Sequence, residues 1–165
     1  MEKETPNENL TPVRAATLSQ KHILGIENMP IPEINALLER ANYFANQPKD
    51  TFSTILANYT VLNIFFENST RTRVSFELAA KRLGASLLNI SVSGSSVKKG
   101  ETLIDTATTL NAMRPDILVV RHHSSGAPLL LSQHVDAAVI NAGDGRHEHP
   151  TPVSYTHLRA HETIH

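Results

Sequence analysis

The residues best suited to binding an anion lie in one short segment, Ser69-Thr70-Arg71-Thr72-Arg73. Hydroxyls, unpaired backbone N–H groups at a predicted helix start and two guanidinium groups are the donors that a dianionic phosphate requires. The alternative interpretation is a capped helix with two solvated arginines. The segment directly follows a predicted strand, and that position favours a phosphate site over the alternative.

Three other polar clusters also follow predicted strands. Lys98 and Lys99 lie in a Ser/Gly-rich loop, where an ammonium group could reach an anionic ligand or stay hydrated. Arg121 follows the apolar run 117–120, which places a cation at a strand end, although an arginine there could also be an ordinary surface residue. His149 could donate a hydrogen bond to a carbonyl or phosphate oxygen from its neutral ring, or be structural.

The elements that must position these clusters alternate between helix and strand. Apolar periodicity predicts helices at 32–46, from the Ser69-Thr70 cap to Gly84, at 101–113 and at 127–133, and strands at 59–65, 86–90, 116–120 and 137–141. The segment 91–100 is predicted to be a long loop. Such alternation favours an α/β fold with a doubly wound parallel sheet flanked by helices, in which ligands bind at the carboxyl ends of the strands.

The composition of the chain argues against several classes of function, among them nucleic-acid binding, cysteine chemistry and metal binding. Fifteen basic against sixteen acidic side chains give a net charge of −1, which does not indicate nucleic-acid or membrane binding. The absence of cysteine excludes disulfides, a thiolate metal site and a thiol nucleophile. Nine histidines are present, but neither His122-His123 nor His147-x-His149 has a third ligand at zinc-type spacing, so no metal or other cofactor is predicted. Without a signal-peptide pattern or a transmembrane run, a soluble cytoplasmic protein is expected.

Three separated motifs resemble the aspartate/ornithine carbamoyltransferase family. The run 66–73, followed by Phe76-Glu77, resembles its phosphate-binding signature, and 95–102 is similar to the mobile loop of aspartate carbamoyltransferases. The stretch 141–151, which ends in His-Pro-Thr, resembles the third motif. Lys99 favours the aspartate over the ornithine branch, which generally lacks this lysine. The polar composition of residues 1–20 predicts an N-terminal arm. The resemblance implies a carbamoyl-phosphate-binding domain at 21–151, and the tail at 152–165 does not resemble the family.

The resemblance also implies a role for each site residue. The phosphate of carbamoyl phosphate would be bound by Ser69, Thr70, Arg71 and Thr72. Arg71 would also stabilise charge on the leaving phosphate. Arg121 and His149 would hold the carbamoyl group, and Thr72 with His149 would polarise its carbonyl oxygen. The family transfers this group to the α-amino group of L-aspartate, in pyrimidine biosynthesis, without a metal or a covalent intermediate.

Assembly and completeness are further expectations from the resemblance. Ser95 and Lys99, of the mobile, aspartate-binding loop, would act in the active site of a neighbouring subunit, which implies a homotrimer, alone or with further subunits. Position 152 is Pro where the family has a carbamoyl-contacting glutamine, and 152–165 is similar to a translated sequencing adaptor. We therefore expect an inactive fragment without its aspartate domain. An ornithine carbamoyltransferase fragment and a stand-alone phosphate-binding domain remain alternatives.

Overall fold

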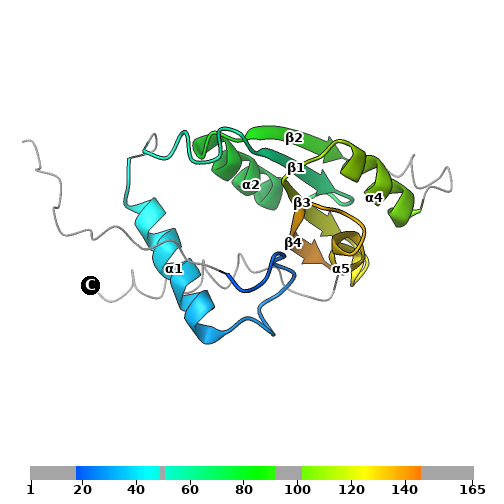
Figure 1. The fold of residues 1–165 in the computed structure, drawn as a ribbon, viewed down its shortest axis with the longest axis horizontal. Coiled ribbons are helices and arrows are strands. Elements are labelled where there is room, and N and C mark those ends of the chain that lie inside the picture. The colour runs from blue at the N-terminus through cyan, green and yellow to red at the C-terminus, as the bar shows by residue number, and fades with distance from the viewer. Residues whose placement is uncertain (1–17, 49–50, 92–101, 146–165) are drawn as a thin grey trace, which may run out of the picture.

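The computed structural model describes residues 18–48, 51–91 and 102–145 (Figure 1). Its elements in chain order are α1 (Ile31–Ala45), β1 (Thr60–Phe65), α2 (Thr70–Arg82), β2 (Ser86–Ser91), α4 (Leu103–Ala112), β3 (Ile117–His122), α5 (Ala127–Ser132) and β4 (Ala138–Asp144). The predicted alternation of helices and strands is confirmed. Most of the predicted N-terminal arm, nearly all of the Ser/Gly loop and the whole tail lie outside the described residues.

The four strands form one parallel sheet in the order β2-β1-β3-β4. The chain moves outward from β1 to β2, then returns to the other side of β1 to form β3 and finally β4. The strand order therefore reverses between β1 and β3. In open α/β sheets, ligands bind beside the carboxyl ends of the two strands at such a switch point.

Apolar side chains cover both faces of the sheet. On one face, Leu62 and Ile64 of β1 and Leu118 and Val120 of β3 are fully buried in a cluster that includes residues of α4 and α5. On the other face, a second cluster joins alternate residues of β1 and β3 to α2: Val61, Phe65, Val119 and Ala80. The predicted doubly wound fold is thus confirmed, with helices packed on both faces.

The ends of the helices next to the site have clear local causes. Gly84, predicted to end α2, has φ +82°, and a Cβ atom there would overlap the carbonyl oxygen of Ser53. α4 begins with a capping box, because Thr102 Oγ1 accepts from Asp105 N at 3.1 Å while Thr102 N donates to Asp105 Oδ2 at 2.9 Å.

A short segment after the arm extends the sheet beyond β4. Ile23 forms a parallel bridge with Ile140, its N–H donates to Val139 O at 2.8 Å, and its carbonyl accepts from Asn141 N at 2.8 Å. The sequence did not predict this pairing. It covers part of an edge that would otherwise expose unpaired backbone groups.

Helix α1 is the least integrated element. None of its residues is buried, and it stands to the side of the sheet (Figure 1). The apolar positions that predicted it, such as Leu37 and Leu38, are at most half-buried. Near its end, Arg40 lies over the ring of Phe44, which packs edge-on against Phe52. Within the described ranges, no helix has the length and apolarity to span a bilayer.

Candidate anion-binding site

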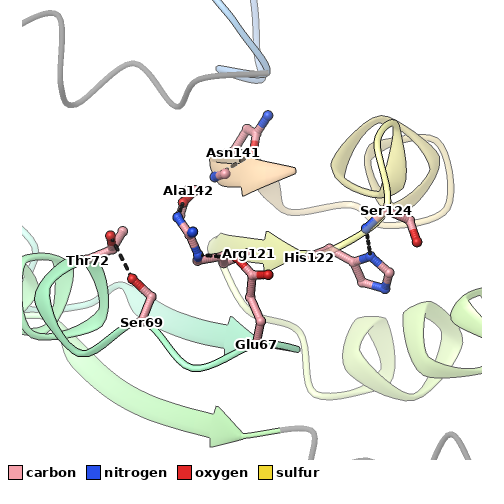
Figure 2. A network of polar contacts seen from close by, with 9 residues as sticks. Glu67, Ser69, Thr72, Arg121, His122, Ser124, Asn141 and Ala142 are labelled. Atoms are coloured by element: carbon pink, nitrogen blue, oxygen red, sulfur yellow. Dashed lines mark hydrogen bonds and ion pairs between the residues drawn. The ribbon is translucent and has the colours of Figure 1, made fainter. Parts of the chain in front are cut away.

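The site begins where β1 passes into α2. Ser69 is the N-cap residue of α2, but its side chain makes no cap hydrogen bond to the first backbone N–H groups of the helix. The Ser69 hydroxyl donates instead to Thr72 Oγ1 at 3.0 Å (Figure 2). Thr70 and Arg71 are exposed. The first turn therefore presents uncapped amides, hydroxyls and a guanidinium group to one approaching anion.

Arg121 is held in place by anchors from two neighbouring strands. Its Nε lies 2.6 Å from Oε1 of Glu67, which follows β1 by two residues. Its Nη1 donates to the carbonyl oxygen of Ala142 in β4 at 3.0 Å. The backbone is joined as well, since Phe66 N donates to Arg121 O at 2.9 Å. Figure 2 shows Arg121 between the start of α2 and the end of β4, so a fixed cation stands at the switch point.

His122, the next residue, is buried and belongs to the same polar network. Its Nδ1 accepts a hydrogen bond from Ser124 N at 2.8 Å (Figure 2). Burial, and to a smaller extent the adjacent His123, lowers the pKa of His122 below its usual range. The two histidine rings are stacked 4.2 Å apart. Among the residues that the structure describes, no group of three His, Cys, Asp or Glu could hold a metal ion.

The end of β4 is ordered by side-chain bonds to the backbone. Asn141 Oδ1 accepts from Gly143 N at 2.8 Å, and Asn141 Nδ2 donates to Leu24 O at 2.9 Å. Asp144 is buried, and its Oδ2 accepts from Gly126 N at 2.8 Å. These bonds give the third sequence motif a fixed start beside Arg121.

The structure therefore brings together five of the predicted site residues at the carboxyl ends of β1 and β3: Ser69, Thr70, Arg71, Thr72 and Arg121. The other three, Ser95, Lys99 and His149, lie outside the described residues. Sequence reasoning missed Glu67 as the partner of Arg121. An acidic residue at the end of β1 was an available signal, because opposite charges at neighbouring strand ends can pair.

Comparison with known proteins agrees with this geometry. Residues 21–154 match the sequence model of the family described as aspartate/ornithine carbamoyltransferase, carbamoyl-P binding domain. The aspartate carbamoyltransferase catalytic subunit of Methylorubrum extorquens (strain PA1) is 58% identical over 144 residues, which cover 86% of this chain and 46% of the relative. That of Rhodospirillum rubrum is 61% identical over 135 residues, covering 81% and 42%. The chain thus spans about half the length of these relatives.

Solved structures of one enzyme show the same fold. Aspartate transcarbamoylase from Trypanosoma cruzi in complex with aspartate and phosphate superposes with a TM-score of 0.80 at 35% identity, covering 94% of this chain and 47% of that one. Its complex with carbamoyl phosphate gives a TM-score of 0.79 at 35% identity, covering 94% and 50%. Because the family model covers most of the chain and the parallel sheet agrees with it, the chain belongs to the aspartate/ornithine carbamoyltransferase family and carries its carbamoyl-phosphate-binding domain.

Proposed function

We propose that this chain is the carbamoyl-phosphate-binding half of an aspartate carbamoyltransferase. The observation that carries the proposal is the uncapped start of α2 at the switch point shared with the anchored guanidinium of Arg121. Carbamoyl phosphate carries a dianionic phosphate and a neutral carbamoyl group. The start of α2 offers hydrogen-bond donors for the phosphate, and Arg121 offers them for the carbamoyl group. The reaction would give N-carbamoyl-L-aspartate and phosphate, a cytoplasmic step of de novo pyrimidine biosynthesis.

Catalysis would consist of positioning and electrostatic stabilisation. The α2 amides, the hydroxyls of Ser69 and Thr70 and the Arg71 guanidinium bind the phosphate, so that negative charge on the leaving group is stabilised. Thr72 and Arg121 donate to the carbamoyl carbonyl oxygen, which becomes more negative as the amine nitrogen attacks the carbon. The new C–N bond forms while the C–O bond to phosphate breaks, and the proton that the amine nitrogen loses passes to the leaving phosphate. By family resemblance, His149 is a further donor to this oxygen.

The choice of acceptor and the assembly are also part of the proposal. L-Aspartate as the acceptor is supported by the names of the relatives and by Lys99. In the proposed homotrimer, Ser95 and Lys99 of one chain act in the site of its neighbour. A face suited to self-association is present on α2, where Val74 and Leu78 lie one turn apart and are 48% and 45% exposed. This chain spans about half the length of its relatives, and we propose carbamoyl phosphate binding as the function of the part that the structure describes.

Calorimetric titration of the 165-residue chain with carbamoyl phosphate tests the proposal. Arg71→Ala removes the exposed guanidinium at the start of α2, while Arg82→Ala removes another exposed guanidinium from its other end and serves as the matched control. We expect binding heat from the parent and from Arg82→Ala, and none from Arg71→Ala. No heat from a parent chain with a folded circular dichroism spectrum would refute the proposal for this chain. Equal affinity for inorganic phosphate would instead indicate a general anion-binding domain.

A further inference from the structure

His122 occupies the opposite face of β3 from the anchored arginine. Side chains alternate along a strand, so Arg121 faces the α2 side together with Val119, while His122 continues the row of Leu118 and Val120 beneath α4 and α5. The His122 side chain is nevertheless at the rim of the sheet, where only 9% of the residue is exposed. His122 therefore lies at the end of the apolar core, on the face of the sheet opposite the anion site.

The His122 ring contacts the segment that leaves β1. Its centroid lies 4.5 Å from that of Phe66, the residue that precedes Glu67. Phe66 is also bonded to β3 through its backbone, since its N–H donates to the Arg121 carbonyl at 2.9 Å. The position of the Glu67 carboxylate, and with it the ion pair to Arg121, thus depends on how Phe66 packs against the imidazole.

The same ring fixes the turn that leaves β3. Its Nδ1 accepts from Ser124 N at 2.8 Å, and a ring nitrogen that accepts carries no proton, so His122 is the neutral tautomer with its hydrogen on Nε2. The turn continues into two bonds to Asp144, from Ser125 Oγ to the carbonyl oxygen at 3.1 Å and from Gly126 N to Oδ2 at 2.8 Å. One imidazole therefore connects the exits of β1 and β3 directly, and that of β4 through the turn.

We infer that neutral His122 is a positioning residue for Arg121. By holding Phe66 and Ser124, it keeps Glu67 and the end of β4, which carry the two anchors of the guanidinium group, at the spacing that anion binding requires. It acts through these groups and does not touch the ligand. The inference rests on the proposed role of Arg121 in binding carbamoyl phosphate.

The charged groups around the His122 imidazole influence whether the ring becomes protonated in acid. Glu67 and Asp144 favour the protonated ring, and His123 opposes it. α5 carries no titratable side chain, and α4 carries only Asp105. Burial keeps the ring neutral near neutral pH because it lowers the pKa. Protonation would put a hydrogen on Nδ1 opposite the N–H of Ser124, break that bond and release the turn. A histidine acting directly on the ligand would do the reverse, since its positive charge would strengthen anion binding.

Two variants of the full chain separate the functions of the ring. His122→Asn keeps an acceptor for the N–H two residues on and does not titrate. His122→Phe keeps the ring contact with Phe66 and loses the acceptor. Near pH 8, we expect carbamoyl phosphate to bind both variants about tenfold more weakly than the parent, because His122→Phe loses the acceptor for Ser124 N and His122→Asn loses the ring contact with Phe66. As the pH falls below about 6.5, the ratio of the parent affinity to that of His122→Asn should fall. The ratio cancels protonation of the ligand itself.

The inference would be overturned by parent-like binding of His122→Phe, or by a parent-to-Asn ratio that stays level or rises in acid. If His122→Phe does not fold, the ratio alone decides. If the parent binds no carbamoyl phosphate, the proposed function fails, and NMR then tests the positioning separately. The Arg121 Nε–H resonance and the exchange rate of the Gly126 amide should then change with acidification in the parent and not in His122→Asn. Unchanged signals in the parent would refute the inference.

Discussion

Arg121, in β3, forms an ion pair with Glu67, the second residue after the end of β1. Nε of Arg121 lies 2.6 Å from Oε1 of Glu67. The two side chains are 24% and 35% exposed, so the pair is only partly screened by water. The cost of removing both charged groups from water offsets much of their attraction, so the net contribution of the pair to stability is small. The second anchor, from Nη1 to Ala142 O, fixes the plane of the guanidinium group. The pair therefore orients a cation more than it stabilises the fold.

Arg121→Lys should weaken carbamoyl phosphate binding and leave the fold nearly unchanged. Lysine keeps the charge, but its single ammonium group cannot hold two separated anchors and donate to the ligand in a fixed plane. We expect about a tenfold loss of affinity by calorimetry and a change of less than about 1 kcal/mol in the free energy of unfolding. Arg82→Lys, at the far end of α2, is the control. Parent-like affinity of Arg121→Lys would show that charge alone suffices.

Asn89→Ala should destabilise the chain because it leaves the buried side-chain amide of Asn63 without its hydrogen-bond acceptor. Asn63 is fully buried in β1, and its Nδ2 donates to Asn89 Oδ1 at 3.1 Å across the strand pair. Without Asn89, the buried amide loses this partner, which costs about 1–3 kcal/mol in the free energy of unfolding. Urea unfolding measures the loss.

The double variant Asn63→Val with Asn89→Val is the companion experiment. It removes both polar groups, and valine suits a buried strand position. We expect it to be more stable than Asn89→Ala, because no unsatisfied amide remains in the core. If the loss in the free energy of unfolding of the double variant equals the sum of the losses in Asn63→Val and Asn89→Val, the two amides do not act as a pair.

The order of elements was predictable from the sequence because it depends on local periodicity. The strand around 117–120 was expected to end before Arg121, yet β3 continues to His122. The reason is not local, since the Arg121 carbonyl accepts from Phe66 N of a distant segment. The pairing of Arg121 with Glu67 depends equally on β1 and β3 being neighbours. Strand order is set by tertiary packing, so apolar patterns reveal which residues form strands but not which strand ends meet.

His22 should make the stability of the chain depend on pH. Its Nδ1 accepts from Val139 N at 3.1 Å, at the edge where 22–24 extends the sheet. Burial first, and Lys21 second, lower the pKa of His22 in the folded chain. The unfolded chain therefore binds more protons as the pH falls through about 6.5, and stability is lost there. The loss levels off below the folded pKa.

His22→Gln tests this linkage because glutamine does not titrate. Between about pH 7.5 and 5.5, the melting temperature of the parent should fall more than that of His22→Gln. Some fall should remain in the variant, since the pKa of His122 is lowered as well. Hydrogen exchange at the Val139 amide should quicken in acid for the parent. Parallel melting curves of the two proteins across this range would contradict the assignment.

We expect the chain to self-associate through α2. Val74 and Leu78 lie on one exposed face of this helix, next to the turn that presents Arg71. Val74→Glu combined with Leu78→Glu places charge on that face, and neither residue belongs to the two buried core clusters, so the fold should survive. We expect the parent to sediment as an oligomer and the double variant as a monomer. Leu129→Glu, at a comparably exposed position on α5, should leave the assembly intact. A parent that remains monomeric at high concentration would refute the proposed trimer for this chain, and disruption by Leu129→Glu alone would move the interface to the opposite face of the sheet.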